Sequence, residues 1–424
     1  MVLDERAREK DTEVMGSVTS GTKRYRQINL AFFAAGFVTF ITLYDVQPLL
    51  PVFSKEFGLP AALGSLPLSL TTCALAVTML FAGTISETFG RKRVMVTSLV
   101  ITSVLAFLTS LTGSFPALLA LRLLQGVALA GLPAIAMAYL SEEIAPASLG
   151  SAIGLYISGN AIGGMTGRIF TAAMTEWISW RAALGSIGVF CLILSIFFAR
   201  SLPPSSNFTR RPFQARYLFS SLFKQLKDPG LLYLYGISFL VMGSFVTLYN
   251  YITFRLLAPP YSLGHTAVSW IFLVYLLGSF SSSMVGRQVE LFGRSRMLYL
   301  TMSTMVLGAL VTLSQDISTI VVGIALFTCG FFGSHTIASS WVGSRARTAR
   351  AQAASLYLFS YYLGSSVSGT AGGLFWASFG WLGVVCLILA LLAVGLCCVK
   401  RLRGISEGER PAGEGVAGLE ALRS

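Results

Sequence analysis

Long apolar runs follow one another along almost the whole chain. A run of about 20 apolar residues is long enough for one helix to cross a bilayer. A chain in lipid must satisfy its backbone polar groups internally, so it crosses as helices or as a closed barrel. These runs are too long and continuous for barrel strands. The sequence therefore predicts an all-α membrane protein with twelve transmembrane helices, at roughly 28–51, 64–86, 94–112, 116–140, 149–173, 182–199, 231–255, 266–286, 297–314, 318–341, 352–375 and 381–399.

The charge content agrees with a chain that mostly faces lipid. Charged residues make up 12% of the sequence, whereas soluble domains carry about 25%. The net charge of +13 comes from cations in short segments between the apolar runs, which is typical of topology signals. We therefore expect the lipid bilayer as the surroundings and no nucleic acid as a partner.

The positions of lysine and arginine predict the orientation of the chain. Of the 31 such residues, 26 fall in the two tails and in alternate connections, and 3 fall in the opposite connections. Connections rich in lysine and arginine remain cytoplasmic. Both termini are therefore predicted to be cytoplasmic, with an N-terminal tail at 1–27 and a C-terminal tail at 400–424. We expect a multi-pass membrane protein.

A glycine-containing loop occurs twice in the chain. Residues 83–93 read GTISETFGRKR, and residues 286–296 read GRQVELFGRSR. Both glycines, the glutamate and the arginine after the second glycine recur at a constant spacing of 203 residues, and Tyr44-Asp45 recurs as Tyr249-Asn250. The first six helices are therefore expected to repeat as the last six. Because six is even, the two halves have the same orientation, which is an architecture of transporters.

The repeat predicts the domain organisation. We expect an N-terminal six-helix bundle at 28–199 and a C-terminal six-helix bundle at 231–399. The basic segment at 200–230 between them is expected to be a cytoplasmic linker, with an amphipathic helix around 214–226 on the membrane surface.

Three motifs resemble those of the major facilitator superfamily. The loop at 83–93 resembles the loop between helices 2 and 3 of that superfamily, although Glu87 and Glu290 stand where aspartate is usual. Arg122-Leu-Leu-Gln-Gly126 resembles its helix 4 motif. The glycines of 150–164 are similar to the helix 5 motif of its proton-driven antiporters.

More narrowly, three segments look like the YnfM-type bacterial inner-membrane transporters, which lie near the drug and sugar efflux branches. The segments are 139–144, 154–160 and 355–366. The resemblance implies a secondary transporter of the bacterial inner (plasma) membrane that exports a small organic compound in exchange for protons. Uptake of a small solute, either proton-linked or facilitated, is the alternative within this class, and a non-transporting membrane sensor or scaffold is the alternative outside it.

The two loops are candidates for a gate. A carboxylate at the cytoplasmic rim that pairs with a cation of another helix would hold one arrangement of the helices and release the other. The alternative is a solvated turn whose cations only set the topology. The gating candidates are Gly83, Glu87, Gly90, Arg91, Gly286, Glu290, Gly293 and Arg294.

Asp45 and Arg122 are the candidates for proton coupling. An acid within a membrane span can bind and release a proton when its site is alternately hydrated. Asp45 lies in the first predicted span, and the superfamily resemblance implies a coupling role for Arg122. Alternatively, Asp45 is hydrated near the outer mouth, and Arg122 extends to the nearby extracellular surface.

Four further residues have expected roles. Arg168 is expected to meet an anionic substrate or, as the structural alternative, to pair with Asp45. Glu142 and Glu143 are expected to pair with cations at the cytoplasmic rim. A lone histidine such as His335 is more often a hydrogen-bonded packing residue than a proton relay.

Tyrosine and asparagine side chains are candidates for the wall of a central cavity. Small residues in the fifth and eleventh spans let helices approach closely, so these spans are expected to form a sliding interface. Aromatic rings and hydrogen-bonding groups among them suit an amphipathic or aromatic solute. The cavity candidates are Tyr44, Tyr156, Asn160, Tyr249, Asn250, Tyr357, Tyr361 and Tyr362.

No motif indicates catalysis. The sequence has no phosphate-binding loop of the type G-x-x-x-x-G-K-[ST], no metal-ligand cluster and no nucleophile–base pair. We therefore expect no enzyme activity, no cofactor and no metal. The expected partners are a small-molecule substrate and protons, and the chain is expected to function as a monomer.

Overall fold

The structure is a computed structural model that describes residues 18–208, 215–346 and 348–408. Its regular structure is helical, apart from one isolated β-bridge between Val18 and Ile144. Much of the predicted tails at 1–27 and 400–424, and residues 209–214 of the predicted linker, lie outside the described residues.

The helices are named in chain order. The first group is α2 (Lys23–Tyr44), η1 (Gln47–Leu49), α3 (Leu50–Glu56), α4 (Ala61–Gly64), α5 (Leu66–Phe89), α6 (Arg91–Ser110), α7 (Phe115–Leu129), α8 (Pro133–Glu143), α9 (Pro146–Trp177) and α10 (Trp180–Ser201). The second group is α11 (Ala215–Gln225), α12 (Pro229–Leu257), α13 (His265–Ser269), η2 (Trp270–Val274), α14 (Tyr275–Phe292), α15 (Arg294–Val311), α16 (Ile317–Arg345) and α17 (Arg350–Gly408).

Proline and glycine explain where the helices depart from the predicted spans. The first predicted span, 28–51, is interrupted after α2 by a 3₁₀ turn that contains Pro48, because proline has no N–H to continue the ladder. The span predicted at 116–140 is divided into α7 and α8, and Pro133 begins α8. The last two predicted spans are joined as α17, whose backbone turns at Gly380 with φ 58° and ψ −146°.

Nine helical segments of the described ranges are long and apolar enough to cross a membrane. One of the nine is residues 350–405, which contains the two predicted spans on either side of Gly380. The nine do not include α9 and α15, although both are long helices that lie among the others. The all-helical membrane fold is therefore confirmed, and the number of twelve spans stays a prediction.

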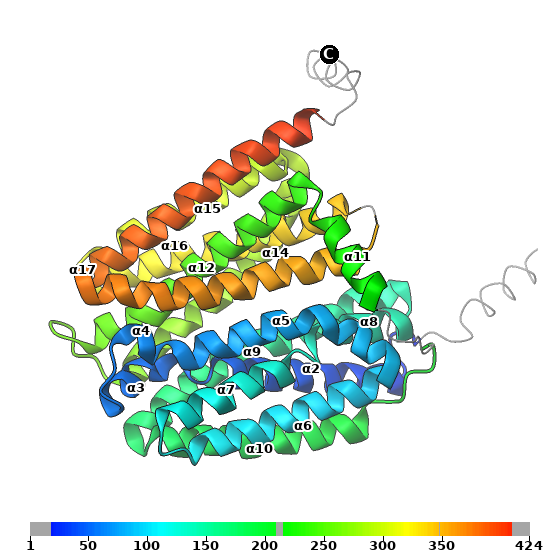
Figure 1. Cartoon of the computed structure of the whole chain (residues 1–424), viewed down its shortest axis with the longest axis horizontal. Coiled ribbons are helices and arrows are strands. Elements are labelled where there is room, and N and C mark those ends of the chain that lie inside the picture. Colours follow the sequence, from blue (N-terminus) through cyan, green and yellow to red (C-terminus); the bar gives the residue numbers. More distant parts are fainter. Residues whose placement is uncertain (1–17, 209–214, 347, 409–424) are drawn as a thin grey trace, which may run out of the picture.

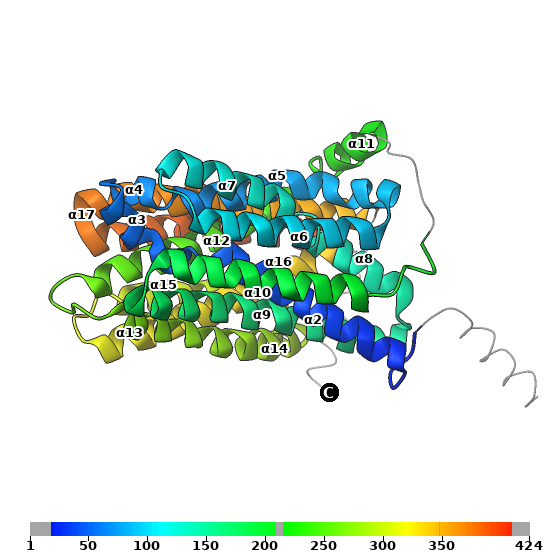
Figure 2. The same ribbon diagram turned by 90° about the horizontal axis from the view of Figure 1, so that it is seen from below.

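The helices form two groups that lie against one another. Figure 1 shows α2–α10 in the lower part of the molecule and α12–α17 in the upper part, with most long helices running in the same general direction. The short helices α3 and α4 lie at one end, and α8 and α11 lie at the other (Figures 1 and 2). The first of these ends is the predicted extracellular end, and the second is the predicted cytoplasmic end.

Two glycines allow equivalent helix pairs to approach closely. A Cβ atom on Gly163 of α9 would collide with the carbonyl oxygen of Phe37 in α2, and one on Gly364 of α17 would collide with that of Phe239 in α12. Each contact is therefore possible only without a side chain at the glycine. Within each half these glycines thus bring backbones of two helices together.

We expect Gly163→Ala and Gly364→Ala each to destabilise the protein by about 1–3 kcal/mol, because an added methyl group forces the paired helices apart. Thermal unfolding of the purified protein in detergent measures the effect. Gly154→Ala is the matched control, since a Cβ there meets nothing within 4 Å. Equal melting temperatures for all three variants would contradict close packing at Gly163 and Gly364.

The amphipathic helix predicted around 214–226 forms as α11. Its Leu218 and Leu222 are buried, whereas Phe219 and Phe223 are exposed. Gln225 donates a hydrogen bond to the carbonyl oxygen of Thr348 (2.8 Å), so the end of α11 is fixed beside the start of α17. Its position on the membrane surface stays a prediction.

Candidate functional site

A buried ion pair joins Arg122 of α7 to Asp45 at the C-terminal end of α2. The Arg122 Nη1 atom lies 3.1 Å from Asp45 Oδ1, and both side chains are 1% exposed. Both predicted surface alternatives are therefore wrong: Asp45 is not hydrated at an outer mouth, and Arg122 does not extend to the extracellular surface. Burial of either charge alone would be costly, which is why the two are found together.

Arg122 is also held by groups that carry no charge. It donates hydrogen bonds to the carbonyl oxygen of Leu43 (3.0 Å), to Gln125 Oε1 (2.7 Å) and to the carbonyl oxygen of Pro67 (3.3 Å). The carbonyl groups at a helix C-terminus favour a cation, and Leu43 belongs to the last turn of α2. Asp45 Oδ2, by contrast, has no hydrogen-bond partner in the described structure. Arg122 therefore has other acceptors if Asp45 becomes neutral.

Arg168 of α9 lies in a second buried position, 3% exposed. Its Nε atom donates to Gln47 Oε1 (2.7 Å), and its Nη1 atom donates to the carbonyl oxygen of Gly164 (2.8 Å). The structural pair of Arg168 with Asp45 that the sequence offered as an alternative is wrong, because the ion pair of Asp45 is with Arg122.

Aromatic rings surround the guanidinium of Arg168. Its central carbon lies 4.0 Å from the ring centre of Tyr44, 4.8 Å from that of Tyr275 and 5.2 Å from that of Phe272. These distances are typical of cation–π contacts. Tyr44 belongs to α2, whereas Phe272 and Tyr275 belong to η2 and α14, so the rings come from both groups of helices.

Gln47 was missed from the sequence, although it joins the two groups of helices. Its Nε2 atom donates to Asn250 Oδ1 of α12 (2.8 Å), and both side chains are buried. No signal in the sequence points to this contact, since the repeat aligns Asn250 with Asp45 and not with Gln47. Phe272 and Tyr275 were missed too, because the sequence does not distinguish an aromatic residue that contacts a cation from one that only packs within an apolar run.

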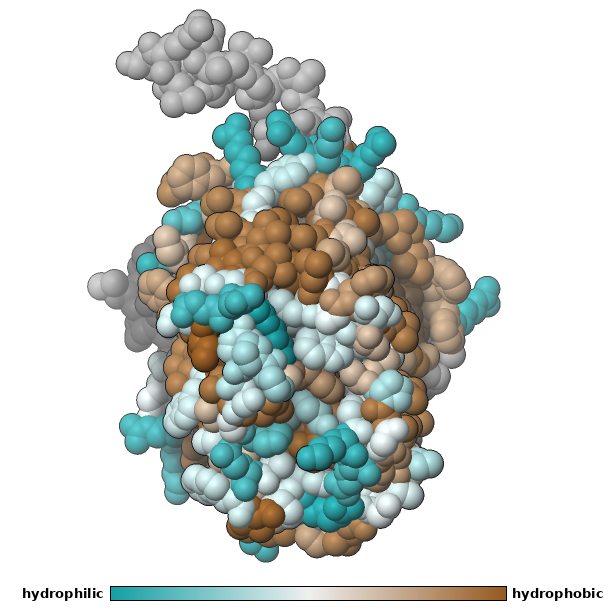
Figure 3. All heavy atoms as spheres, turned by 90° about the vertical axis from the view of Figure 1, so that its left-hand side faces the viewer, coloured by the Kyte–Doolittle hydropathy of each residue, from teal (hydrophilic) through white to brown (hydrophobic). Residues whose placement is uncertain are grey.

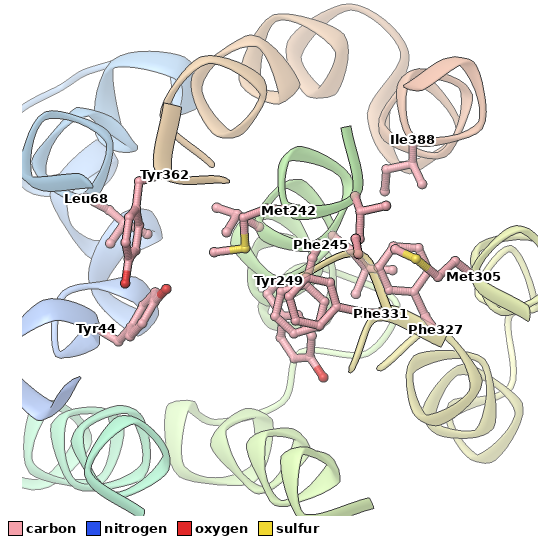
Figure 4. Close-up of a cluster of buried hydrophobic side chains, with 14 of the residues drawn as sticks. Tyr44, Leu68, Met242, Phe245, Tyr249, Met305, Phe327, Phe331, Tyr362 and Ile388 are labelled. Carbon is pink, nitrogen blue, oxygen red and sulfur yellow. The ribbon is translucent and has the colours of Figure 1, made fainter. Parts of the chain in front are cut away.

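The tyrosine candidates of α12 and α17 face different neighbours. In Figure 4, Tyr44 of α2 and Tyr362 of α17 direct their hydroxyl groups toward one another. The Tyr361 ring lies 5.1 Å from that of Tyr362, and the Tyr249 hydroxyl pairs with Thr328 Oγ1 (2.7 Å). Tyr44 and Tyr362 therefore meet between the two groups of helices, whereas Tyr249 points toward α16 within the second group.

Tyr357 and His335 form a hydrogen-bonded pair beside this group. The Tyr357 hydroxyl lies 2.9 Å from His335 Nδ1, and the His335 ring is stacked on that of Phe331, with centroids 6.1 Å apart. His335 is thus a hydrogen-bonded packing residue, as predicted. Its ring also lies 4.9 Å from that of Tyr361.

Tyr156 and Asn160 lie where α9 packs on α2. Tyr156 is 3% exposed and has its ring edge against Phe32, with centroids 6.2 Å apart. The side chain of Asn160 occupies the space beside Gly36, where a Cβ atom would collide with it. These two candidates therefore contribute to helix packing within the first group.

The two groups of helices are joined at the predicted extracellular end. Thr370 of α17 donates to Ser69 Oγ of α5 (2.8 Å), and Thr72 Oγ1 of α5 lies 3.3 Å from Ser366 Oγ of α17. The backbone N–H of Thr266 in α13 donates to a carboxylate oxygen of Glu176 in α9 (2.6 Å). Figure 3 looks onto this end and shows side chains filling the surface between the groups.

The opposite end has a cleft of about 840 Å³ between α5 and α8 on one side and α17 on the other. Gly83, Glu87 and Arg91 line it, together with Gln352 and Ser355 of α17. Closed at one end and open at the other, the molecule is inward-open in the predicted orientation.

The first gating loop is paired within its own half. Arg91 Nη2 lies 2.8 Å from Glu142 Oε1 of α8 and 3.8 Å from Glu87 Oε1. Glu143 is fully buried and accepts from Arg24 Nη2 (3.0 Å). Glu142 and Glu143 thus pair with cations at this end, as predicted.

The second gating loop has the same backbone conformation at its glycine as the first, but its charged side chains have different partners. Gly90 (φ 98°) and Gly293 (φ 83°) both adopt a left-handed conformation that favours glycine. Glu290 is exposed and forms no ion pair within the described ranges, and Arg294 donates to Ser344 Oγ (2.6 Å). At Gly83 and Gly286 a Cβ atom would meet nothing within 4 Å, so packing does not require glycine there.

Sequence comparison identifies relatives that span nearly the whole chain. The family model of the Major Facilitator Superfamily matches residues 29–259. The chain is 52% identical to the MFS-type transporter YybF of Bacillus subtilis, over 90% of this chain and 95% of that one. It is 43% identical to the inner membrane transport protein YnfM of Escherichia coli, over 91% of this chain and 92% of that one.

Solved structures show the same fold. A bacterial homologue of the lysosomal transporter Spinster, in an inward-facing and unoccupied conformation, matches with a TM-score of 0.71 and 14% identity over 93% of this chain and all of that one. A mutant of the nucleoside transporter NupG matches with a TM-score of 0.72 and 13% identity over 89% of this chain and 99% of that one. The chain therefore belongs to the major facilitator superfamily, and it is a multi-pass membrane transporter and not an enzyme.

Proposed function

We propose that this transporter exports a small organic compound in exchange for protons, with Asp45 as the group that carries the proton. The observation that carries the proposal is the buried pair of Asp45 with Arg122 (3.1 Å), in which Asp45 Oδ2 remains without a partner. Asp45 is the one carboxylate of the described residues that is buried within a predicted span. Glu143, which is also buried, lies at the predicted cytoplasmic end.

Protonation of Asp45 changes the charge of this site by one unit. The ionised carboxylate forms a neutral pair with Arg122. The protonated acid leaves the charge of Arg122 uncompensated, but Leu43 and Gln125 continue to hold the guanidinium in place. A proton can therefore be exchanged at Asp45 without loss of the contact between α7 and α2.

We propose that the two halves, 28–199 and 231–399, rock about a central cavity while the segment at 200–230 connects them. The inward-open arrangement supports this movement, since hydrogen bonds close one end and a cleft opens the other. We propose that the chain works as a monomer of the bacterial inner membrane with both termini in the cytoplasm. The name of the relative YnfM, an inner membrane transport protein, supports this location.

Two more distant relatives support a small organic substrate. A probable 4-methylmuconolactone transporter of Cupriavidus pinatubonensis is 30% identical over 39% of this chain. The chloramphenicol resistance protein CraA of Acinetobacter baumannii is 24% identical over 46% of it. Both relatives are named for small organic compounds, and a role in resistance favours export over uptake.

Inside-out membrane vesicles test the direction and the coupling together. An imposed pH gradient is followed with a fluorescent dye while drugs, sugars and amino acids are added one at a time. We expect one class of compound to dissipate the gradient and to accumulate inside the vesicles. A compound that crosses without proton movement would instead indicate facilitated diffusion.

We propose that the loop at 83–93 latches the cytoplasmic end when the cleft closes. Glu87→Gln is expected to shift the equilibrium between the two states, because the carboxylate that approaches Arg91 (3.8 Å) is removed. The measurement is the labelling rate of a cysteine introduced at Ser355, which lines the cleft. Glu290→Gln is the comparison and is expected to change the rate less, because Glu290 is exposed. Equal labelling of Glu87→Gln and the parent would contradict the latch.

A further inference from the structure

Arg168 is a buried cation without a carboxylate beside it. Among the described residues, no aspartate or glutamate oxygen lies within 4.0 Å of its nitrogen atoms, and its side chain lies almost wholly inside the protein. A charge at membrane depth is costly, and proteins usually pair it or direct it to a substrate pathway. Since the nearby Asp45 is paired with Arg122, Arg168 requires a different explanation.

The hydrogen bonds of Arg168 leave one side of the guanidinium without a partner. A guanidinium has five N–H donors in a planar fork. Nε donates to Gln47 and Nη1 donates to Gly164, whereas Nη2 makes no hydrogen bond to the residues that the structure describes. The ring contacts of the guanidinium are cation–π contacts, and the rings provide no oxygen acceptor for Nη2 at these faces. A planar carboxylate is the group that such a fork binds best.

The charges buried within the predicted spans also favour an anion. Asp45, Arg122 and Arg168 are the charged side chains of the described residues buried there, and together they leave one positive charge when Asp45 is ionised. A cationic solute would be repelled from this region. A monoanion would neutralise it, whereas a polyanion would add charge that nothing buried there compensates.

We propose that the transported compound is an organic monocarboxylate, whose carboxylate binds Arg168 and whose apolar or aromatic body packs against the surrounding rings. This inference rests on the proposed function and names its substrate class. The rings of Tyr44, Tyr275 and Phe272 lie 4.0, 4.8 and 5.2 Å from the guanidinium carbon, so an apolar body next to the carboxylate meets aromatic surface.

The site lies between the two groups of helices, which is where alternating access requires a substrate to bind. Arg168 and Tyr44 belong to the first group of helices, and Phe272 and Tyr275 belong to the second. Gln47, which holds Arg168, is itself bonded to Asn250 of α12 (2.8 Å). A carboxylate on Arg168 therefore contacts both halves, and its binding or release changes the contacts between them.

The test compares carboxylates with neutral amides of the same shape. Benzoate, phenylacetate and cinnamate are each paired with benzamide, phenylacetamide or cinnamamide. Dissociation constants are measured by titration calorimetry on the full-length protein in nanodiscs, and transport is measured as counterflow in liposomes. We expect at least one carboxylate to bind the parent protein about tenfold or more tightly than its amide, since a hydrogen bond to a charged group supplies this difference.

Gln47→Glu is the sharpest variant, because it supplies an internal carboxylate 2.7 Å from Arg168 Nε without removing the arginine. It is expected to remain folded and to lose the preference for carboxylates. Arg168→Lys retains the charge but not the planar fork, and we expect carboxylates to bind it about tenfold more weakly. Arg181→Gln is the matched control, since Arg181 also lies on a ring, that of Trp180 at 4.2 Å, but is 41% exposed and paired with Glu56.

Loss of the carboxylate preference in Gln47→Glu and Arg168→Lys, with the preference retained in Arg181→Gln, would support the proposal. Equal affinity of the parent for all carboxylates and their amides would overturn it, and so would a preference that survives in Gln47→Glu. Proton-coupled transport of a neutral or cationic compound would reject the substrate class and leave the proposed function standing. Absence of proton movement with a carboxylate that still crosses would reject the coupling alone.

Discussion

Asp45→Asn is expected to abolish proton-driven accumulation and to leave exchange of the solute across the membrane. The amide has nearly the shape of the acid but cannot release a proton, so Arg122 keeps a neutral partner while the coupled step is lost. The buried position of Asp45, 3.1 Å from Arg122, makes this the variant with the largest expected effect on function. Accumulation under a pH gradient and counterflow at equal pH, both in liposomes, measure the two activities.

Asp316→Asn is the matched control for this result. Asp316 is fully exposed and caps α16 by accepting from the backbone N–H of Thr319 (2.8 Å), a role that asparagine also fills. The control is expected to accumulate solute like the parent. Normal accumulation by Asp45→Asn would show that the proton is carried elsewhere.

Arg122→Gln is expected to have the largest effect on stability, with a loss of about 3–5 kcal/mol, because it leaves a buried carboxylate without its cation. It also removes the hydrogen bonds from Arg122 to Leu43 and Pro67, which join α7 to α2 and α5. Thermal unfolding in detergent, together with the amount of protein recovered from membranes, measures this loss.

The double variant Asp45→Asn/Arg122→Gln separates the charge from the packing. If the unpaired carboxylate causes the loss, removing it restores part of the stability, so the double variant is more stable than Arg122→Gln alone. A double variant whose loss equals the sum of the two single losses would show that Asp45 and Arg122 are not energetically coupled.

The sequence was sufficient for the membrane fold because its strongest signals are local. Long apolar runs predict spanning helices wherever they occur, and the spacing of 203 residues between the two loops shows the repeat. Span ends were less predictable. The first predicted span ends early at the turn that contains Pro48, and the fourth is divided before Pro133. These prolines are visible in the sequence, but it does not show whether each one bends, ends or begins a helix.

The candidate site was only partly predictable, because its contacts join residues far apart in the chain. Asp45 and Arg122 were each identified as charges in apolar runs, but their pairing depends on how α7 packs against α2. The same limit led to the wrong expectation of an Arg168–Asp45 pair. Gln47 forms hydrogen bonds with both Arg168 and Asn250. It was missed because its amide is neutral, and charge within an apolar run was the signal that identified Asp45 and Arg122.

The repeat made both loops candidates for a gate. The backbone is indeed repeated, with left-handed glycines at Gly90 and Gly293. The partner of the arginine is not repeated. Arg91 forms an ion pair with Glu142, whereas Arg294 donates a hydrogen bond to the hydroxyl group of Ser344. Symmetry in the sequence of a loop therefore predicts its conformation better than its contacts with the next helix.

Proton release on addition of solute tests the central claim most directly. Purified protein in weakly buffered detergent is mixed with a transported solute while a pH indicator reports protons that enter or leave the bulk solution. If solute and proton exchange through Asp45, the parent releases protons in proportion to the amount of protein, and Asp45→Asn releases none. Equal proton release by the parent and Asp45→Asn, or solute binding by the parent without any release, would contradict the claim.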